Sequence, residues 1–180
     1  SFAKDLIETL ISNELVMQNK INLSIMMPED GTSNIPMHVD THSGESPFQC
    51  VVWLPLVNVY ETKGMYVLPP KENLKLMENF SNIMKNGGQK KINDLIQPHL
   101  KWPKIDFGDF LLFSPNYLHG SVINITKETR WSLNTRFKSL FSPYGSKEKG
   151  LGNFYSPIKI SPITKIGMNY IPPIGLLSND

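Results

Sequence analysis

The feature that most constrains the fold is a series of short β-prone segments that begins at Ile21 and continues to Leu140. The segments are rich in Val, Ile, Trp, Tyr and Phe, and turn formers such as Pro28–Gly31 and Ser43–Gly44 separate them. The predicted strands are Ile21–Met27, Ile35–Asp40, Phe48–Val57, Gly64–Leu68, Lys104–Phe107, Phe110–Ser114, Tyr117–Ile123 and Thr129–Leu140. This pattern favours a mainly β fold of two sheets, a cupin-like jelly roll or double-stranded β-helix.

Helices are expected to flank these sheets. Residues 1–18 place apolar residues three and four apart without Gly or Pro, which predicts a helix. Residues 71–96 predict a helical insertion that Gly87-Gly88 splits in two. Residues 142–180 are rich in Pro, Gly, Ser and Lys and are expected to form an irregular tail. A chain of 180 residues suits one core, so we expect residues 1–180 to form a single domain, with 21–141 as its jelly-roll core.

The charge pattern favours a small-molecule substrate. The net charge is +2 and no block of like charges occurs, so neither a nucleic-acid partner nor a membrane partner is expected. Positions 138–179 contain five lysines and one acid, Glu148. This stretch is either simply solvated or attracts an anionic substrate such as a phosphorylated sugar. No pattern indicates an oligomeric state.

The cellular location is expected to be cytoplasmic. Cys50 is the single cysteine, so an internal disulfide is excluded and a reducing compartment fits. Acidic residues interrupt the apolar residues of positions 1–18, which therefore lack the continuous apolar stretch of a signal peptide. The chain opens at Ser1 without a methionine and directly in an amphipathic pattern, which leaves room for further residues upstream.

A metal site is predicted from three residues. His38 and Asp40 are two residues apart, and on a strand such residues project from the same face, so both could bind one ion. His119, at the beginning of another predicted strand, is the candidate third ligand. Iron(II) suits two histidines and one carboxylate, because this facial triad leaves positions open for a chelating ligand and dioxygen. A His-x-Asp pair alone is common by chance, so the prediction also depends on the residues after His119.

The strand predicted at Thr129–Leu140 carries a second candidate feature. Alternation puts residues 130, 132, 134 and 136 on one face, which we expect to point inward. A buried arginine requires an anion, and the guanidinium of Arg130 with the hydroxyl of Ser132 would suit a carboxylate. A β-hairpin turning near Lys127 would bring Arg130 beside His119. The alternative is a surface ion pair between Arg130 and Glu128.

The ordered set His38-x-Asp40, His119 and Arg130-x-Ser132 resembles the iron(II)- and 2-oxoglutarate-dependent oxygenases, within them the phytanoyl-CoA dioxygenase-like branch, over roughly residues 21–141. Supporting stretches are Lys63–Pro69 and Asp106–Phe113. A closer likeness, to bacterial oxygenases of carbohydrate and aminoglycoside biosynthesis clusters, lies in Ser46–Gln49, Trp53–Leu56 and Arg130–Tyr144. The chain departs from the branch after Pro69, where a lysine-rich helix replaces the usual glycine-serine-histidine turn.

The resemblance implies an activity and its cofactors. Iron(II) would be held by the triad, 2-oxoglutarate would bind Arg130 and Ser132, and dioxygen would be the co-substrate of a hydroxylation. The substrate would be small and polar, such as a sugar or nucleotide-sugar. Halogenating relatives lack the carboxylate ligand, so Asp40 argues against halogenation. Gln49, Trp53 and Arg136 are candidates for the substrate pocket, since strand alternation can place them near the metal.

Two alternatives remain open from the sequence. His38, Asp40, His42 and Glu45 can be read as a compact ligand cluster of a cupin-type metalloenzyme that does not use 2-oxoglutarate, although the turn at Ser43-Gly44 would direct His42 away. A jelly-roll module without catalysis could instead bind carbohydrate with its three tryptophans, at positions 53, 102 and 131.

Overall fold

The computed structural model describes residues 2–173, which form eight strands and three α-helices. The strands are β1 (Leu15–Gln18), β2 (Asn22–Met26), β3 (Gln49–Pro55), β4 (Tyr66–Val67), β5 (Leu111–Phe113), β6 (His119–Gly120), β7 (Arg130–Ser139) and β8 (Tyr155–Lys159). The helices are α1 (Phe2–Leu10), α2 (Pro70–Ile96) and α3 (Pro162–Met168). Every helix within this range is too short or too polar to cross a membrane.

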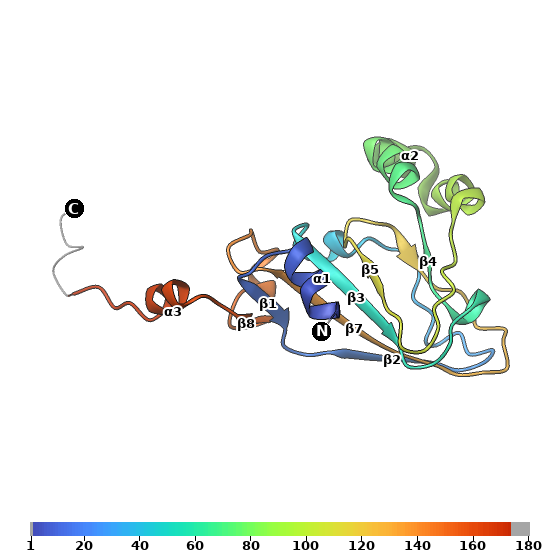
Figure 1. Cartoon of the computed structure of the whole chain (residues 1–180). Coiled ribbons are helices and arrows are strands. Elements are labelled where there is room, and N and C mark those ends of the chain that lie inside the picture. The colour runs from blue at the N-terminus through green and yellow to red at the C-terminus, as the bar shows by residue number, and fades with distance from the viewer. Residues whose placement is uncertain (1, 174–180) are drawn as a thin grey trace.

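The larger sheet is built around β7, its longest strand (Figure 1). One edge of β7 pairs with β3, and the other edge pairs with β2 along its first half and β1 along its second half. β5 and β8 extend the sheet at its two ends, and all pairings are antiparallel. The predicted alternation of β7 is confirmed, because Arg130, Ser132 and Arg136 are buried whereas Trp131 is exposed.

The smaller sheet consists of β4 and β6, and an isolated bridge between His38 and His119 adds a third segment to it. Apolar residues from both sides fill the space between the two sheets: Val51, Trp53, Val59, Met65, Ile105 and Phe113. Two antiparallel sheets with flanking helices form the mainly β jelly roll that the strand pattern predicts.

Helix α2 confirms the predicted insertion and its break. Gly88 has φ 60° and ψ −164°, a conformation that glycine adopts without strain and that divides the helix into two arms. The arms pack on the outer side of the smaller sheet through Leu76, Ile92 and Ile96 against Tyr66 and Leu118. Figure 1 shows α2 standing beside β4, away from the larger sheet.

Both ends of the chain differ from the prediction. The helix expected over residues 1–18 ends at Leu10, because Leu15–Gln18 forms β1 and is hydrogen-bonded to β7 on one side and β8 on the other. The expected irregular tail contains β8 and α3, and residues 174–180 lie outside the described part of the chain. Pro157 interrupts the β8 pattern in the sequence but is tolerated there because β8 is an edge strand.

Two predicted strands are also absent from the described residues. Residues 35–40 form only the single bridge at His38, since Pro36 has no N–H and Asp40 begins the 3₁₀ turn Asp40–Ser43. Residues 104–107 form only isolated bridges, including one between Val59 and Ile105. The backbone turns directly afterwards at Gly108, whose φ is +100°.

Candidate metal centre and co-substrate pocket

Backbone pairing brings His38 and His119 together. Each residue donates its N–H to the carbonyl of the other, at 2.9 and 3.0 Å, so the two form a directly opposed antiparallel pair. Their rings consequently lie side by side, with centroids 4.1 Å apart. Asn73 of α2 fixes the approach to His119, because its amide donates to the carbonyl of Asn116 and accepts from the N–H of Leu118.

Asp40 completes the cluster from the start of the 3₁₀ turn. Val39 is extended, with φ −127° and ψ 122°, so His38 and Asp40 point to the same side as predicted. Oδ1 of Asp40 lies 3.2 Å from Nε2 of His38 and 3.6 Å from Nε2 of His119. One ligand atom from each residue lies within 4.8 Å of the other two, which is close enough for all three to bind one metal ion.

The two imidazoles are oriented for metal binding. Nδ1 of His38 is 2.9 Å from the carbonyl of Pro36, and Nδ1 of His119 is 2.8 Å from the carbonyl of Tyr117. In the neutral ring, donation from Nδ1 to a carbonyl leaves the lone pair on Nε2, the atom that faces the cluster. Burial, with the neighbouring His38, lowers the pKa of His119 to about 4, so this ring is neutral at pH 7.

Asp40 is held as a carboxylate by its neighbours. Burial alone would raise its pKa, but hydrogen bonding with His38 and the charge of Arg136 outweigh burial and lower the pKa to about 2. Arg136 donates to Oδ2 of Asp40 at 2.9 Å. The same hydrogen bond with Asp40 raises the pKa of His38. The cluster therefore offers an ionised carboxylate at neutral pH, the form that binds a metal.

A cavity of about 240 Å³ adjoins the cluster and also reaches Trp53, Arg130 and Arg136. Arg130 and His119 line it from different sheets, so the hairpin expected between them is wrong: β6 pairs with β4, whereas β7 belongs to the larger sheet. The chain crosses between the sheets after residue 120, where the two-residue strand β6 ends. The two side chains consequently line the same cavity from opposite sheets.

Arg130 is a buried cation without an acidic partner among residues 2–173, which argues against the alternative ion pair with Glu128. Glu128 instead pairs with Lys63. The Arg130 guanidinium donates to the carbonyl of Gly64 and the hydroxyl of Ser24, both at 3.2 Å, and its Nε is buried without a hydrogen-bond partner. Burial lowers its pKa to about 10, so it remains charged at pH 7.

Two serines lie near Arg130. Ser132 is fully buried and its hydroxyl has no hydrogen-bond partner in the described structure, but its side chain does not line the cavity. Ser24 of β2, directly opposite Ser132 in register, does line the cavity. Ser24 was missed from the sequence because only the pairing of β2 with β7 brings it there.

The three pocket candidates are placed differently. Trp53 lines the cavity, with its ring centroid 5.6 Å from the Arg130 guanidinium. Gln49 does not, because its amide donates to Glu45 and accepts from the hydroxyl of Tyr155 in a buried network. Arg136 lines the cavity, but its two terminal guanidinium nitrogens donate hydrogen bonds to Gln18 and Asp40.

The structure does not bring together the residues on which the cupin-type and carbohydrate-binding alternatives depend. The ring of His42 packs against Phe80, at a centroid distance of 5.3 Å, and it is not part of the metal cluster. Glu45 contacts Arg136 and Lys149 instead of the cluster. The three tryptophans do not share a surface: Trp53 is buried in the cavity, the residue at 131 lies on the opposite face of β7, and the one at 102 packs on Tyr66.

Two histidines and one carboxylate that can share one ion form the donor set of facial-triad iron(II) sites. No protein-family model and no curated protein matches the chain. Among solved structures, it is similar to the non-haem monooxygenase ThoJ in its nickel complex, with 15% identity and a TM-score of 0.62 over 87% of this chain and 56% of ThoJ.

Two further solved structures share the fold. SnoN, a non-haem α-ketoglutarate-dependent epimerase from nogalamycin biosynthesis, has 17% identity and a TM-score of 0.54 over 79% of this chain and 54% of SnoN. EctD from S. alaskensis with 2-oxoglutarate and 5-hydroxyectoine has 16% identity and a TM-score of 0.54 over 73% of this chain and 46% of EctD. This chain therefore spans about half the length of these proteins, and the likeness shows a common fold.

Proposed function

We propose that this chain is an iron(II)- and 2-oxoglutarate-dependent oxygenase that hydroxylates a small polar substrate. The observation that carries the proposal is that Arg130, a buried cation with no acidic partner among the described residues, lines the same cavity as the triad. An uncompensated buried charge is costly unless a ligand neutralises it. A dicarboxylate that reaches from the metal to Arg130 would satisfy both ends of this cavity.

The residues present fit this metal and co-substrate. His38, Asp40 and His119 would hold the iron, and Arg130 with Ser24 would bind the distal carboxylate of 2-oxoglutarate. When bound, iron and 2-oxoglutarate supply oxidation by dioxygen, in which a substrate C–H bond is hydroxylated while 2-oxoglutarate yields succinate and carbon dioxide. The carbonyl of Tyr117 keeps His119 in its ligating tautomer, and the buried ring of Trp53 excludes water from Arg130.

The substrate is proposed to extend beyond the metal cavity. The metal cavity has a volume of about 240 Å³, below the ~300–1,000 Å³ that is typical of ligand pockets, and 2-oxoglutarate would occupy part of it. A second cavity of about 400 Å³ shares Asn22 and Arg136 with the first and also contacts Lys20 and Lys149. This polar, lysine-bearing neighbouring cavity supports a substrate with hydroxyl or anionic groups.

The first experiment is an anaerobic titration of iron(II)-loaded protein with 2-oxoglutarate, followed by the visible metal-to-ligand charge-transfer band. The wild type should develop the band, and His119→Ala should lose it because one ligand is missing. Arg130→Met should require much more 2-oxoglutarate, whereas Lys127→Met, which removes an exposed cation outside the cavity, should behave as the wild type. Folded, iron-loaded wild type without a band would contradict the proposal.

A parallel variant addresses the cupin-type alternative. His42→Ala should keep the metal affinity of the wild type, because the His42 ring packs on Phe80 outside the cluster. If His42→Ala instead loses iron while Arg130→Met has no effect on activity, the site is a cupin-type centre that does not need 2-oxoglutarate.

A further inference from the structure

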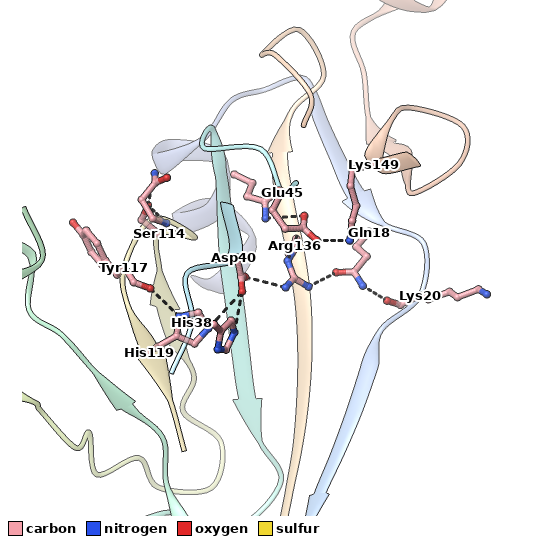
Figure 2. A network of polar contacts seen from close by, with 12 residues as sticks. Gln18, Lys20, His38, Asp40, Glu45, Ser114, Tyr117, His119, Arg136 and Lys149 are labelled. Atoms are coloured by element: carbon pink, nitrogen blue, oxygen red, sulfur yellow. Dashed lines mark hydrogen bonds and ion pairs between the residues drawn. The ribbon is translucent and has the colours of Figure 1, made fainter. Parts of the chain in front are cut away.

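Arg136 is held by three side chains from two segments of the chain, β1 and the turn at residues 40–45. Its Nη2 donates to Oδ2 of Asp40 at 2.9 Å, and its Nη1 donates to Oε1 of Gln18 in β1 at 3.1 Å. Its Nε faces Oε2 of Glu45 at 3.7 Å. Lys149 in turn binds Oε1 of Glu45 at 2.7 Å. Figure 2 shows the Arg136 guanidinium between Asp40 and Gln18, with Glu45 above it.

These contacts give the two carboxylate oxygens of Asp40 different partners. Oδ2 is occupied by Arg136, whereas Oδ1 is the oxygen near Nε2 of both histidines. A carboxylate whose second oxygen is held by a guanidinium cannot turn to present both oxygens to one ion without losing a charge-assisted hydrogen bond. A ligand that uses a single oxygen leaves one more coordination position for other ligands.

We propose that Arg136 is a positioning residue, which fixes Asp40 as a metal ligand through Oδ1 alone. The proposal rests on the proposed function only in requiring that the triad binds a metal. It replaces the sequence-based expectation that Arg136 contacts the substrate, since Asp40 and Gln18 already occupy both terminal nitrogens of its fork.

The planar fork of arginine is essential to this role. A guanidinium can donate in two fixed directions at once, whereas a lysine ammonium is a single point charge on a flexible stem. Arg136→Lys therefore retains the positive charge between Asp40 and Glu45 but loses the simultaneous anchoring to Gln18. This exchange separates orientation from charge, and it avoids leaving two buried carboxylates without the cation between them.

The test uses cobalt(II) as the probe, because its visible d–d spectrum reports the ligand set. Metal-depleted full-length protein is titrated with cobalt(II) in the absence of 2-oxoglutarate. Arg136→Lys should bind cobalt(II) about 10- to 100-fold more weakly, as is typical when a group that orients a metal ligand is changed. Its spectrum should also differ from that of the wild type, because Oδ2 of Asp40 becomes available.

Arg130→Lys is the matched exchange on the same face of β7. Arg130 does not contact the triad, so this variant should retain the cobalt(II) affinity and spectrum of the wild type and should bind 2-oxoglutarate more weakly. Gln18→Leu provides a second variant, which removes one anchor of Arg136 while keeping the arginine. It should change affinity and spectrum in the same direction by a smaller factor.

The outcomes separate this inference from the proposed function. Wild-type affinity and spectrum in folded Arg136→Lys would overturn the positioning role, even if 2-oxoglutarate binds normally. If Arg136→Lys does not fold, an unchanged spectrum and affinity in Gln18→Leu would overturn it. A wild type that binds cobalt(II) but not 2-oxoglutarate would refute the proposed co-substrate and leave the positioning role intact, and a wild type that binds no metal would refute both.

Discussion

Arg130 should reduce the stability of the ligand-free protein. Burial lowers its pKa to about 10, and a drop of this size from the usual value of an arginine corresponds to about 3 kcal/mol at ~1.4 kcal/mol per pKa unit. The folded protein holds the charged guanidinium less well than the unfolded chain, so this penalty is present at every pH below about 10. It would be relieved only as the pH rises above about 10.

Arg130→Met should therefore stabilise the metal-free protein. Methionine keeps apolar volume beside Trp53 and removes the buried charge. The variant loses the hydrogen bonds to Gly64 and Ser24, which together contribute about 1–2 kcal/mol. The net gain should be about 1–2 kcal/mol, measured at pH 7 as a higher urea midpoint with an unchanged slope.

Adding ligands should reverse the order of the two proteins. With iron(II) and 2-oxoglutarate under anaerobic conditions, the wild type should gain about 3 kcal/mol when 2-oxoglutarate is near 100 times its Kd. Arg130→Met should gain much less, because the distal carboxylate has no cation to bind. Metal-free Arg130→Met that is less stable than the wild type by more than about 1 kcal/mol would refute the reasoning, since it would show that the contacts of Arg130 outweigh its burial.

Two further predictions concern the stability of the fold. Gly120→Ala would place a Cβ 2.5 Å from the hydroxyl of Tyr66 and should lower the free energy of unfolding by about 1–3 kcal/mol. The control Gly167→Ala, whose Cβ would have nothing within 4 Å, should be neutral or stabilising by up to ~1 kcal/mol. Equal shifts of the melting temperature in the two variants would contradict this prediction. Burial lowers the pKa of Lys138 from 10.5 to about 8, so the unfolded chain binds more protons between these values. The stability of the wild type relative to Lys138→Met should consequently rise from pH 8 to 10.5, and a difference that stays constant with pH would show that Lys138 is not desolvated.

Alternation was the most informative signal for the fold. Residues 130–139 alternate strictly enough to predict which side chains of β7 point inward, because a strand has a fixed period of two. β1 could not be predicted in this way, since Leu15–Gln18 continues the apolar spacing of the preceding helix. Its strand conformation depends on hydrogen bonds to β7 and β8, which are far away in the sequence.

The candidate site was predictable in its composition but not in its connections. The spacing of His38 and Asp40 predicts a common direction, which the extended backbone at Val39 confirms. The hairpin expected between His119 and Arg130 is wrong, because sequence distance does not reveal that β6 and β7 belong to different sheets. The partners of Arg136 could not be predicted either, since pairing of β1 with β7 brings Gln18 to it.

The two arginines of β7 lie on the same face and yet differ in charge balance. At the metal end, the acids Asp40 and Glu45 cancel the cations Arg136 and Lys149. At the other end, the described neighbours of Arg130 are uncharged, so its positive charge is not cancelled. A divalent metal would add two positive charges to this single one, and a doubly charged ligand would leave one. A dianion that bridges the two ends would therefore compensate Arg130 and half of the metal charge, whereas a monocarboxylate that meets the metal alone would leave Arg130 buried and uncompensated.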